Sequence, residues 1–161
     1  MSRTVARSAL RVEVLRGARS RTPSSADILT WARAALGRRA GDRELAVRIV
    51  GTRASRRLNA RFRGRDRATN VLSFAPPQTP LPHAASAPRP LGDLVLCSPL
   101  VQREARRQGK SVRAHFAHLI VHGALHLAGY DHERPRDARR MERREVEVLK
   151  GLGFANPYRS L

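Results

Sequence analysis

Apolar and polar residues along the chain follow two periods, the two-residue period of a strand and the 3.6-residue period of a helix. Alternation, or a short apolar run of strand length, predicts strands over residues 10–15, 45–50, 70–74 and 92–97. The helical period predicts helices from Ser24 to Gly37, from Thr52 past Phe62, from Ser98 to Gly109, from Ser111 to Gly129 and from about Asp137 to Gly151. No internal repeat interrupts this alternation of strands and helices.

The residues at the ends of these elements add detail to the prediction. Ser24, Thr52 and Ser111 have short polar side chains that can cap the N-termini of three helices. The first strand alternates like an edge strand, whereas residues 70–74 have the apolar character of a buried strand. Residues 75–91 contain six of the ten prolines and show no period. They predict a long irregular loop, either a functional flap or a disordered segment.

The length of 161 residues predicts a single domain over residues 1–161, large enough to bury roughly 70% of its unfolded surface. Residues 1–9 are rich in Arg and Ser, and we expect a disordered arm there, with an organellar transit signal as the less favoured alternative. Cys97 is the only cysteine, which excludes an intrachain disulfide and predicts a reducing, cytoplasmic location. No apolar run reaches the length of a membrane span, so no membrane partner is expected.

The charge of the chain predicts a polyanionic partner. Lys and Arg number 32 against 13 Asp and Glu, which gives a net charge of +19 and a pI of about 11.9. Only Lys110 and Lys150 are lysines, and arginine presents a planar fork that binds phosphate and stacks on bases. A GC-rich genome would account for the choice of Arg over Lys but not for the scarcity of acids. The composition therefore favours binding to RNA or DNA.

The most specific chemical feature is a tract of histidines in the fourth predicted helix. His122 and His126 are four residues apart, which places them on one helix face with an offset of about 40° and about 6 Å. Gly129 can leave the helix with a positive φ, and His132 follows three residues later. A lone histidine on an apolar face is usually packed or hydrogen-bonded, but three at this spacing favour a metal site. The spacing matches the ligand pattern of the metzincin peptidases.

The donor set predicts the ion and its use. Imidazole ligands favour zinc ahead of copper, iron or nickel, so we expect one Zn²⁺ ion per chain. Three neutral ligands leave a fourth position open, as catalytic zinc sites do. His118 forms a rival pair with His122, but only the pair of His122 and His126 is followed by the glycine and the third histidine. His118 is therefore expected to support the site or the core. Gly123 stands where metzincins carry their glutamate base.

Three segments of the chain together resemble one known family. The tract from His122 to His132 closely resembles the signature of the YbeY family, bacterial endoribonucleases that act in ribosomal RNA maturation. The segments 58–74 and 91–97 resemble two further blocks of the same family. With the matching order of elements, the resemblance covers roughly residues 42–158.

This resemblance implies a zincin-like α+β fold, with a small mixed sheet flanked by helices and a three-histidine metal site at the end of a long helix. It implies zinc bound by His122, His126 and His132, and a functionally important arginine at Arg63. The implied activity is single-strand-specific, zinc-dependent cleavage of RNA in late ribosomal RNA processing, at the 3′ end of 16S RNA, and in ribosome quality control. The implied partners are ribosomal RNA, the ribosomal particle, and ribosomal or assembly-factor proteins.

Elementary chemistry agrees with that activity. RNA carries its own nucleophile, the 2′-hydroxyl, so a nuclease has no need of the peptidase glutamate. A guanidinium beside the metal would stabilise charge on the phosphate, and Arg63 is our candidate because it ends a helix that leads into a strand. The alternative role of Arg63 is an ion pair with Asp66. Asp131 has two open roles, orienting the ring N–H of a ligand or capping the turn at Gly129.

Two rival functions follow from the same residues. A zinc peptidase would use the histidine site, but Gly123 leaves it without a carboxylate base. A non-catalytic, basic assembly factor would bind ribosomal RNA and use the metal only to fix the end of the helix. The open fourth ligand position of three histidines favours catalysis over that structural role.

Overall fold

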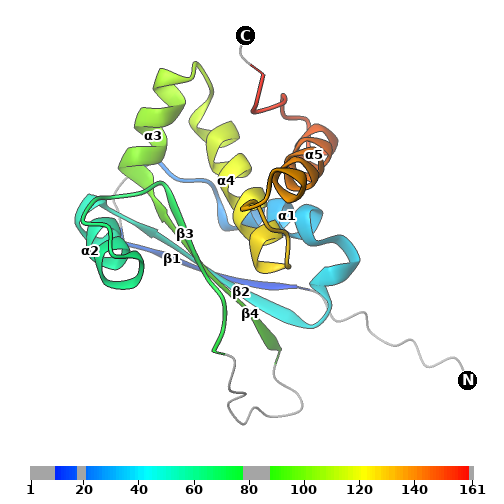
Figure 1. Ribbon diagram of the computed structural model, residues 1–161, viewed down its shortest axis with the longest axis horizontal. Coiled ribbons are helices and arrows are strands. Elements are labelled where there is room, and N and C mark those ends of the chain that lie inside the picture. Colours follow the sequence, from blue (N-terminus) through cyan, green and yellow to red (C-terminus); the bar gives the residue numbers. More distant parts are fainter. Residues whose placement is uncertain (1–9, 18–20, 78–87, 160–161) are drawn as a thin grey trace, which may run out of the picture.

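The computed structural model describes residues 10–17, 21–77 and 88–159, and Figure 1 shows a sheet with helices packed against it. The strands are β1 (Arg11–Arg16), β2 (Arg43–Val50), β3 (Val71–Phe74) and β4 (Arg89–Cys97). The helices are α1 (Ser25–Leu36), the short 3₁₀ helix η1 (Gly37–Ala40), α2 (Thr52–Arg63), α3 (Ser98–Arg107), α4 (Val112–Leu127) and α5 (Pro135–Gly151). All the strands and α-helices predicted from the sequence period are confirmed. The expected arm over residues 1–9 lies outside the described residues.

The strands form one mixed sheet in the order β1-β2-β4-β3. β1, β2 and β4 run parallel, and β3 runs antiparallel to β4. This confirms the α+β class, the small mixed sheet and the edge position of β1. β3 forms the opposite edge, and Leu72 is its one buried residue. The prediction of a buried strand over 70–74 is therefore wrong, because β3 has a neighbouring strand, β4, along only one of its two edges.

Alternate residues of β4 point into two separate apolar clusters. Leu94 and Leu96 belong to the main core, which also holds buried side chains of α1, α4 and α5. Val95 belongs to a smaller cluster that includes Leu58 of α2. Since neighbouring strand residues face opposite sides, α2 covers the other face of the sheet. Figure 1 shows α1, α4 and α5 grouped together on one side.

α4 is the central helix of the core, and its two ends determine where the histidines lie. The side chain of Ser111 caps its N-terminus by accepting a hydrogen bond from the Ala114 N–H at 3.1 Å. Gly129 follows the C-terminus with φ of +106°, a conformation that glycine adopts without strain. The backbone therefore turns sharply after α4, and residues 130–134 lead into α5. None of the helices in the described ranges is long and apolar enough to span a membrane.

The proline-rich loop is shorter than the sequence predicts. β4 begins at Arg89, where Arg89 and Pro90 pair with β2, so the expected loop of 75–91 includes the first residues of a strand. A proline at the start of a strand removes no essential ladder bond, which makes the sequence pattern a poor guide here. Residues 78–87 of this loop lie outside the described part of the chain.

Two helix starts also differ from the prediction. Gly51, not Thr52, is the N-cap of α2, and its end has no side-chain cap. Helix α5 begins at Pro135 instead of about Asp137, because proline suits the first turn of a helix, where its missing N–H costs no bond.

Gly92 lets the end of β3 and the end of α4 approach β4 closely. Its φ is +143°, and an added Cβ would lie 2.5 Å from the carbonyl oxygen of Phe74 and 2.8 Å from a methyl group of Leu127. No side chain fits between these atoms. The close approach brings β3 beside the histidine-bearing end of α4, and that junction forms one side of the candidate site.

Candidate metal centre

α4 and the turn after it gather the three predicted histidines. His122 and His126 lie one turn apart on the last part of α4, and His132 lies in the turn before α5. The ring centre of His132 is 5.6 Å from that of His122 and 5.3 Å from that of His126. Two imidazoles bound to one tetrahedral zinc have ring centres roughly 5 Å apart, given nitrogen–zinc distances of about 2 Å. The ring spacing therefore fits a shared ion.

The donor set also suits a metal ion, although its coordination geometry is not formed. Burial, followed by the neighbouring His132 and His122, lowers the pKa of His126 below 6.5, and the neutral imidazole is the form that binds metal. The Nδ1 atom of His126 is buried and has no hydrogen-bond partner. Across the described ranges, no three His, Cys, Asp or Glu side chains are arranged as a coordination set.

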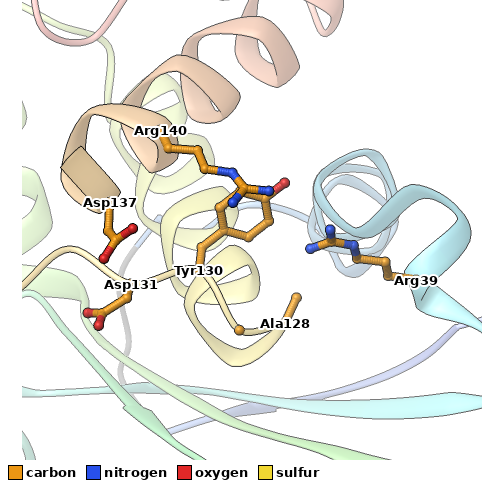
Figure 2. A pocket seen from close by; sticks show the side chains of 7 residues that line it. Arg39, Ala128, Tyr130, Asp131, Asp137 and Arg140 are labelled. Carbon is orange, nitrogen blue, oxygen red and sulfur yellow. The ribbon is translucent and has the colours of Figure 1, made fainter. Parts of the chain in front are cut away.

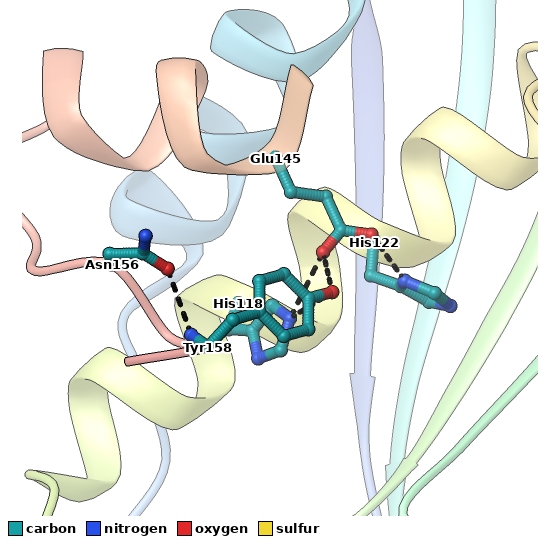
Figure 3. Close-up of polar contacts among 5 residues, drawn as sticks. All are labelled: His118, His122, Glu145, Asn156 and Tyr158. Atoms are coloured by element: carbon teal, nitrogen blue, oxygen red, sulfur yellow. Dashed lines mark hydrogen bonds and ion pairs between the residues drawn. The ribbon is translucent and has the colours of Figure 1, made fainter. Parts of the chain in front are cut away.

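Glu145 contacts the candidate ligand His122, although the sequence pattern alone does not single it out. Its side chain on α5 is fully buried, and one carboxylate oxygen accepts a hydrogen bond from Nδ1 of His122 at 2.5 Å. The other oxygen contacts Nε2 of His118 at 3.1 Å and accepts a hydrogen bond from the Tyr158 hydroxyl. Figure 3 shows the three side chains converging on the carboxylate. An Nδ1–H held in this way leaves Nε2 of His122 with its lone pair, as a metal ligand requires.

The electrostatics of this network keep Glu145 ionised. Burial acts to raise the pKa of Glu145, but the hydrogen bonds from His118, His122 and Tyr158 outweigh it and lower the pKa to about 2. Burial and the Glu145 carboxylate raise the pKa of Tyr158, so its hydroxyl stays protonated as a donor. His118 therefore contacts the same carboxylate that accepts the hydrogen bond from His122.

Asp131 caps the turn and does not orient a ligand ring. Its Oδ1 accepts hydrogen bonds from the backbone N–H groups of His132 at 2.7 Å and Glu133 at 3.0 Å. Hydrogen bonding to the Glu133 N–H is the main reason that the pKa of Asp131 is lowered. Of its two open roles, the structural one is observed. The carboxylate that contacts a ring nitrogen of a candidate ligand is Glu145, at His122.

The histidines open into a groove of about 660 Å³, and two separate parts of the chain contribute its walls. One wall consists of His122, Gly123, His126, His132 and Glu133. The other comes from α2, β3 and the segment between them, and it includes Asn59, Arg63, Arg65, Arg67, Thr69 and Asn70. Three arginines and one glutamate therefore share this groove with the candidate metal ligands, and the groove favours an anion.

Arg63 lies in this groove, but its partner differs from the predicted one. Its Nη2 donates a hydrogen bond to the carbonyl oxygen of Ser73 at 2.7 Å, and its guanidinium lies 5.3 Å from the ring centre of Phe74. Asp66 instead forms a bidentate pair with Arg56, at 2.8 and 3.0 Å. The alternative of an ion pair between Arg63 and Asp66 is therefore wrong. Arg63 is anchored to β3, beside the histidines.

An exposed aromatic side chain adjoins the same wall. Phe62 is 50% exposed and packs edge-on against Phe74, with ring centres 5.3 Å apart. The guanidinium of Arg61 lies 5.1 Å from the ring centre of Phe62. Together with Arg63 on Phe74, this gives a surface of alternating arginine and aromatic groups next to the groove.

Gly123 is held in place by packing. A Cβ at this position would lie 2.6 Å from one methyl group of Leu94 and 3.1 Å from the other. Leu94 is fully buried, so its methyl groups can move away only by displacing other core side chains. A glutamate base of the metzincin kind does not fit here without a shift of β4 or α4.

The chain is similar to known proteins over most of its length. The family profile described as Endoribonuclease YbeY matches residues 19–153. Endoribonuclease YbeY of Aromatoleum aromaticum is 54% identical over 140 residues, covering 87% of this chain and 84% of that protein. The protein of the same name from Alkalilimnicola ehrlichii is 50% identical over 157 residues, covering 93% and 90%.

A solved structure shares the fold. The solution structure of a protein from Thermotoga maritima superposes with a TM-score of 0.54 and 23% identity, and the match covers 93% of this chain and 99% of that one. The profile match over residues 19–153 includes the groove, the histidines and Glu145. This chain belongs to the YbeY family of endoribonucleases.

Proposed function

We propose that this protein is a zinc-dependent endoribonuclease that cuts single-stranded RNA in late ribosomal RNA processing. The observation that carries the proposal is the groove in which three histidines and Arg63 lie together. A metal ion and an oriented guanidinium at the same place can both stabilise the charge that develops on a phosphate during phosphodiester cleavage. Membership of an endoribonuclease family supports the same activity.

His122, His126 and His132 are the residues that would hold the ion, in a zincin-like arrangement. Zinc is our choice because a set of imidazoles favours it. When bound, the ion supplies positive charge and Lewis acidity at the phosphate. Glu145 fixes the ring of His122 through its Nδ1–H, so that Nε2 is the atom offered to the ion.

Arg63 is the residue that we propose to hold the scissile phosphate. The Ser73 carbonyl engages one N–H of its guanidinium and fixes its orientation. The guanidinium carries five N–H donors, so it can still present a two-pronged face to phosphate oxygens. Because the group is already oriented, little reorganisation is needed as negative charge develops on those oxygens.

The groove favours RNA over a peptide. Gly123 and its contact with Leu94 leave no space for the carboxylate that metzincin peptidases use to activate water. RNA supplies its own 2′-hydroxyl nucleophile beside each phosphate. The chain's net charge of +19 also attracts a polyanion such as RNA.

The exposed ring of Phe62 supports a preference for single strands. Bases that are unpaired can stack on an aromatic side chain, and each such contact contributes about 1–3 kcal/mol. The bases of a duplex are already stacked and paired, so they gain nothing from this ring. We therefore propose that Phe62 receives an unpaired base next to the phosphate on Arg63.

In the cell, we propose that the substrate is ribosomal RNA in the cytoplasm, within a ribosomal particle, with the 3′ end of 16S RNA as the site. Ribosomal or assembly-factor proteins would present this RNA. The same substrate would give the protein a role in ribosome quality control. Family membership and the basic surface support this assignment.

Cleavage of a defined RNA tests the proposal against a non-catalytic assembly role. The purified protein is incubated with zinc and a single-stranded oligonucleotide from the 3′ end of 16S RNA, with and without a chelator. We expect cleavage that the chelator abolishes and that zinc restores. His126→Ala should be inactive, whereas Arg139→Ala, which changes an exposed arginine of α5, should cleave like the parent. RNA binding without cleavage, unaffected by the chelator, would favour the assembly factor.

A further inference from the structure

A second pocket lies behind the turn that carries His132. Its volume is about 320 Å³, and Figure 2 shows Tyr130 at its centre, with Arg39 of η1 and Arg140 of α5 directed toward the ring. A neighbouring pocket of about 460 Å³ shares Arg140 and Asp137 with the first and adds Arg134, Arg136 and Arg143. Together they form one basic hollow between η1 and the start of α5. We call it the Tyr130 hollow.

Tyr130 orients two of these arginines. The guanidinium carbon of Arg39 lies 5.0 Å from the centre of its ring, and that of Arg140 lies 5.8 Å away. A guanidinium near an aromatic ring is attracted by the π electrons, while its N–H edge still points outward. Tyr130 is itself half-buried against the main core, which makes it a fixed support. The guanidinium groups of Arg39 and Arg140 are therefore preorganised to bind an anion.

The Tyr130 hollow has an excess of positive charge. Five arginines line it against two aspartates. Arg136, Arg140 and Arg143 follow one another at helical spacing, so they form a stripe along one face of α5. None of the five forms an ion pair with a carboxylate within the described residues. One of the two aspartates, Asp131, accepts hydrogen bonds from two backbone N–H groups.

The short turn after α4 separates the Tyr130 hollow from the metal groove. Tyr130 and Asp131 line the hollow, whereas His132 and Glu133 line the groove. Arg134 returns to the hollow. A strand bound in the groove has only this turn to cross before it reaches the arginines.

We propose that the Tyr130 hollow is a second binding subsite for the same RNA strand, and that it holds phosphates upstream or downstream of the cleaved one. This inference rests on the proposed function. Arginines without carboxylate partners, grouped about an aromatic ring, suit a flexible single strand, whose phosphates can follow a curved path. An acidic protein would offer carboxylates of fixed spacing instead, and it is an outcome that the test distinguishes.

Binding of single-stranded RNAs of increasing length tests the subsite. One series is extended on the 5′ side of the cleavage site and the other on the 3′ side, and affinity is measured by fluorescence anisotropy with non-cleavable 2′-deoxy substitution at that site. We expect one series to gain affinity once the strand reaches the hollow. The double variant Arg39→Ala/Arg140→Ala should lose this gain, and its salt slope should fall by about 0.7 for each phosphate that the variant no longer neutralises. Its cleavage of a short RNA that fills only the groove should be unchanged.

Two control variants make the result specific. Arg103→Ala/Arg107→Ala removes the same charge from exposed positions of α3, and it should retain the gain with length. Tyr130→Phe keeps the aromatic ring and should bind like the parent, whereas Tyr130→Leu should bind long strands as weakly as the double variant. Circular dichroism and zinc content verify that each variant is folded.

Several outcomes would overturn the subsite. The proposal fails if the double variant keeps the parental gain, or if the α3 control loses it equally. It also fails if neither RNA series gains affinity with length while an acidic peptide binds the parent and not the double variant. In each case the parent still cleaves the short RNA, and the proposed function stands. If the parent protein cleaves no RNA but still gains affinity with RNA length, the proposed nuclease activity is wrong and the proposed subsite stands.

Discussion

The carboxylate of Glu145 lies 2.5 Å from Nδ1 of His122, so a fully buried acid on α5 sets the proton position of a histidine on α4. The two residues are 23 positions apart, and the core that joins α4 to α5 is what brings them together. A carboxylate behind a metal-binding imidazole fixes its tautomer and raises its basicity. The position of α5 therefore bears on the chemistry of the groove.

Replacing Glu145 by Gln should weaken zinc binding while the fold remains. The amide is nearly isosteric, but it is neutral and cannot stabilise the orientation of the His122 ring as the carboxylate does. Losses of about 10- to 100-fold in metal affinity are typical for such partners. Titration of the apoprotein with zinc against a competing chelator measures the change. Glu142→Gln, an exposed change on the same helix, should leave the affinity unaltered. Equal affinities in the two variants would exclude a role of Glu145 in metal binding.

The packing of Gly123 gives a prediction about stability. Gly123→Ala should lower the free energy of unfolding by about 1–3 kcal/mol, because its methyl group overlaps Leu94 in a close-packed core. Gly151→Ala is the matched control, since nothing lies within 4 Å of an added Cβ at that helix end. The control should be neutral or stabilising by up to about 1 kcal/mol. Urea denaturation of the apoproteins compares the two, and a Gly123→Ala protein as stable as the control would contradict the packing argument.

Protonation of His115 should make stability depend on pH. Burial is the main reason that the pKa of His115 is lowered from 6.5, and the nearby Glu104 only partly opposes it. The unfolded chain therefore binds a proton at a higher pH than the folded chain does. As a result, the free energy of unfolding should decline as pH falls from about 6.5 through the lower folded pKa.

His115→Gln removes that titration. Unfolding of the parent and the variant by urea at pH values between 7 and 5 gives the comparison, with both proteins free of metal. The difference in unfolding free energy between the two should change with pH, and the parent should lose more on acidification. Parallel curves would show that His115 titrates alike in both states.

The sequence predicts best what depends on local spacing. The helical period places His122 and His126 on one face, and Gly129 allows the turn that brings His132 back. The sequence does not indicate the contacts of Glu145, because its partners lie on another helix and near the C-terminus. A signal was present, however: Glu145 stands at helical spacing from Met141, Val148 and Leu149, and an acid on such an apolar stripe requires a buried partner.

Long-range contacts explain the other differences from the sequence prediction. Arg63 and Asp66 are close in sequence, on either side of the end of α2 at Gly64, but they do not pair. Arg63 donates to the Ser73 carbonyl, and Asp66 forms its ion pair with Arg56. The sequence does not predict the first residues of β4 as strand, because proline has a low strand propensity. Pairing with β2 outweighs that propensity in the structure. In both cases a tertiary contact determines the outcome, which is the partner of Arg63 in the first and the start of β4 in the second.

The role of Arg63 gives the sharpest prediction about catalysis. Arg63→Ala should leave the fold and zinc content unchanged but slow the cleavage of a short single-stranded RNA by about two to three orders of magnitude, the usual loss when one oriented donor is removed. The loss should appear in kcat more than in KM, because the interaction strengthens as charge develops on the phosphate. Arg63→Lys should restore only part of the rate, since an ammonium cannot reproduce the two-pronged guanidinium.

Arg61→Ala is the matched control for Arg63. Arg61 ends the same helix and also lies over an aromatic ring, but it does not line the groove. Single-turnover cleavage at saturating enzyme separates the chemical step from binding in all three variants. Arg61→Ala should weaken RNA binding slightly and leave the chemical step intact, because Arg61 lies over Phe62 outside the groove and does not contact the scissile phosphate in our proposal. If Arg63→Ala and Arg61→Ala slow the chemical step equally, Arg63 contributes general charge alone, and the phosphate must be oriented by Arg65 or Arg67 on the same wall.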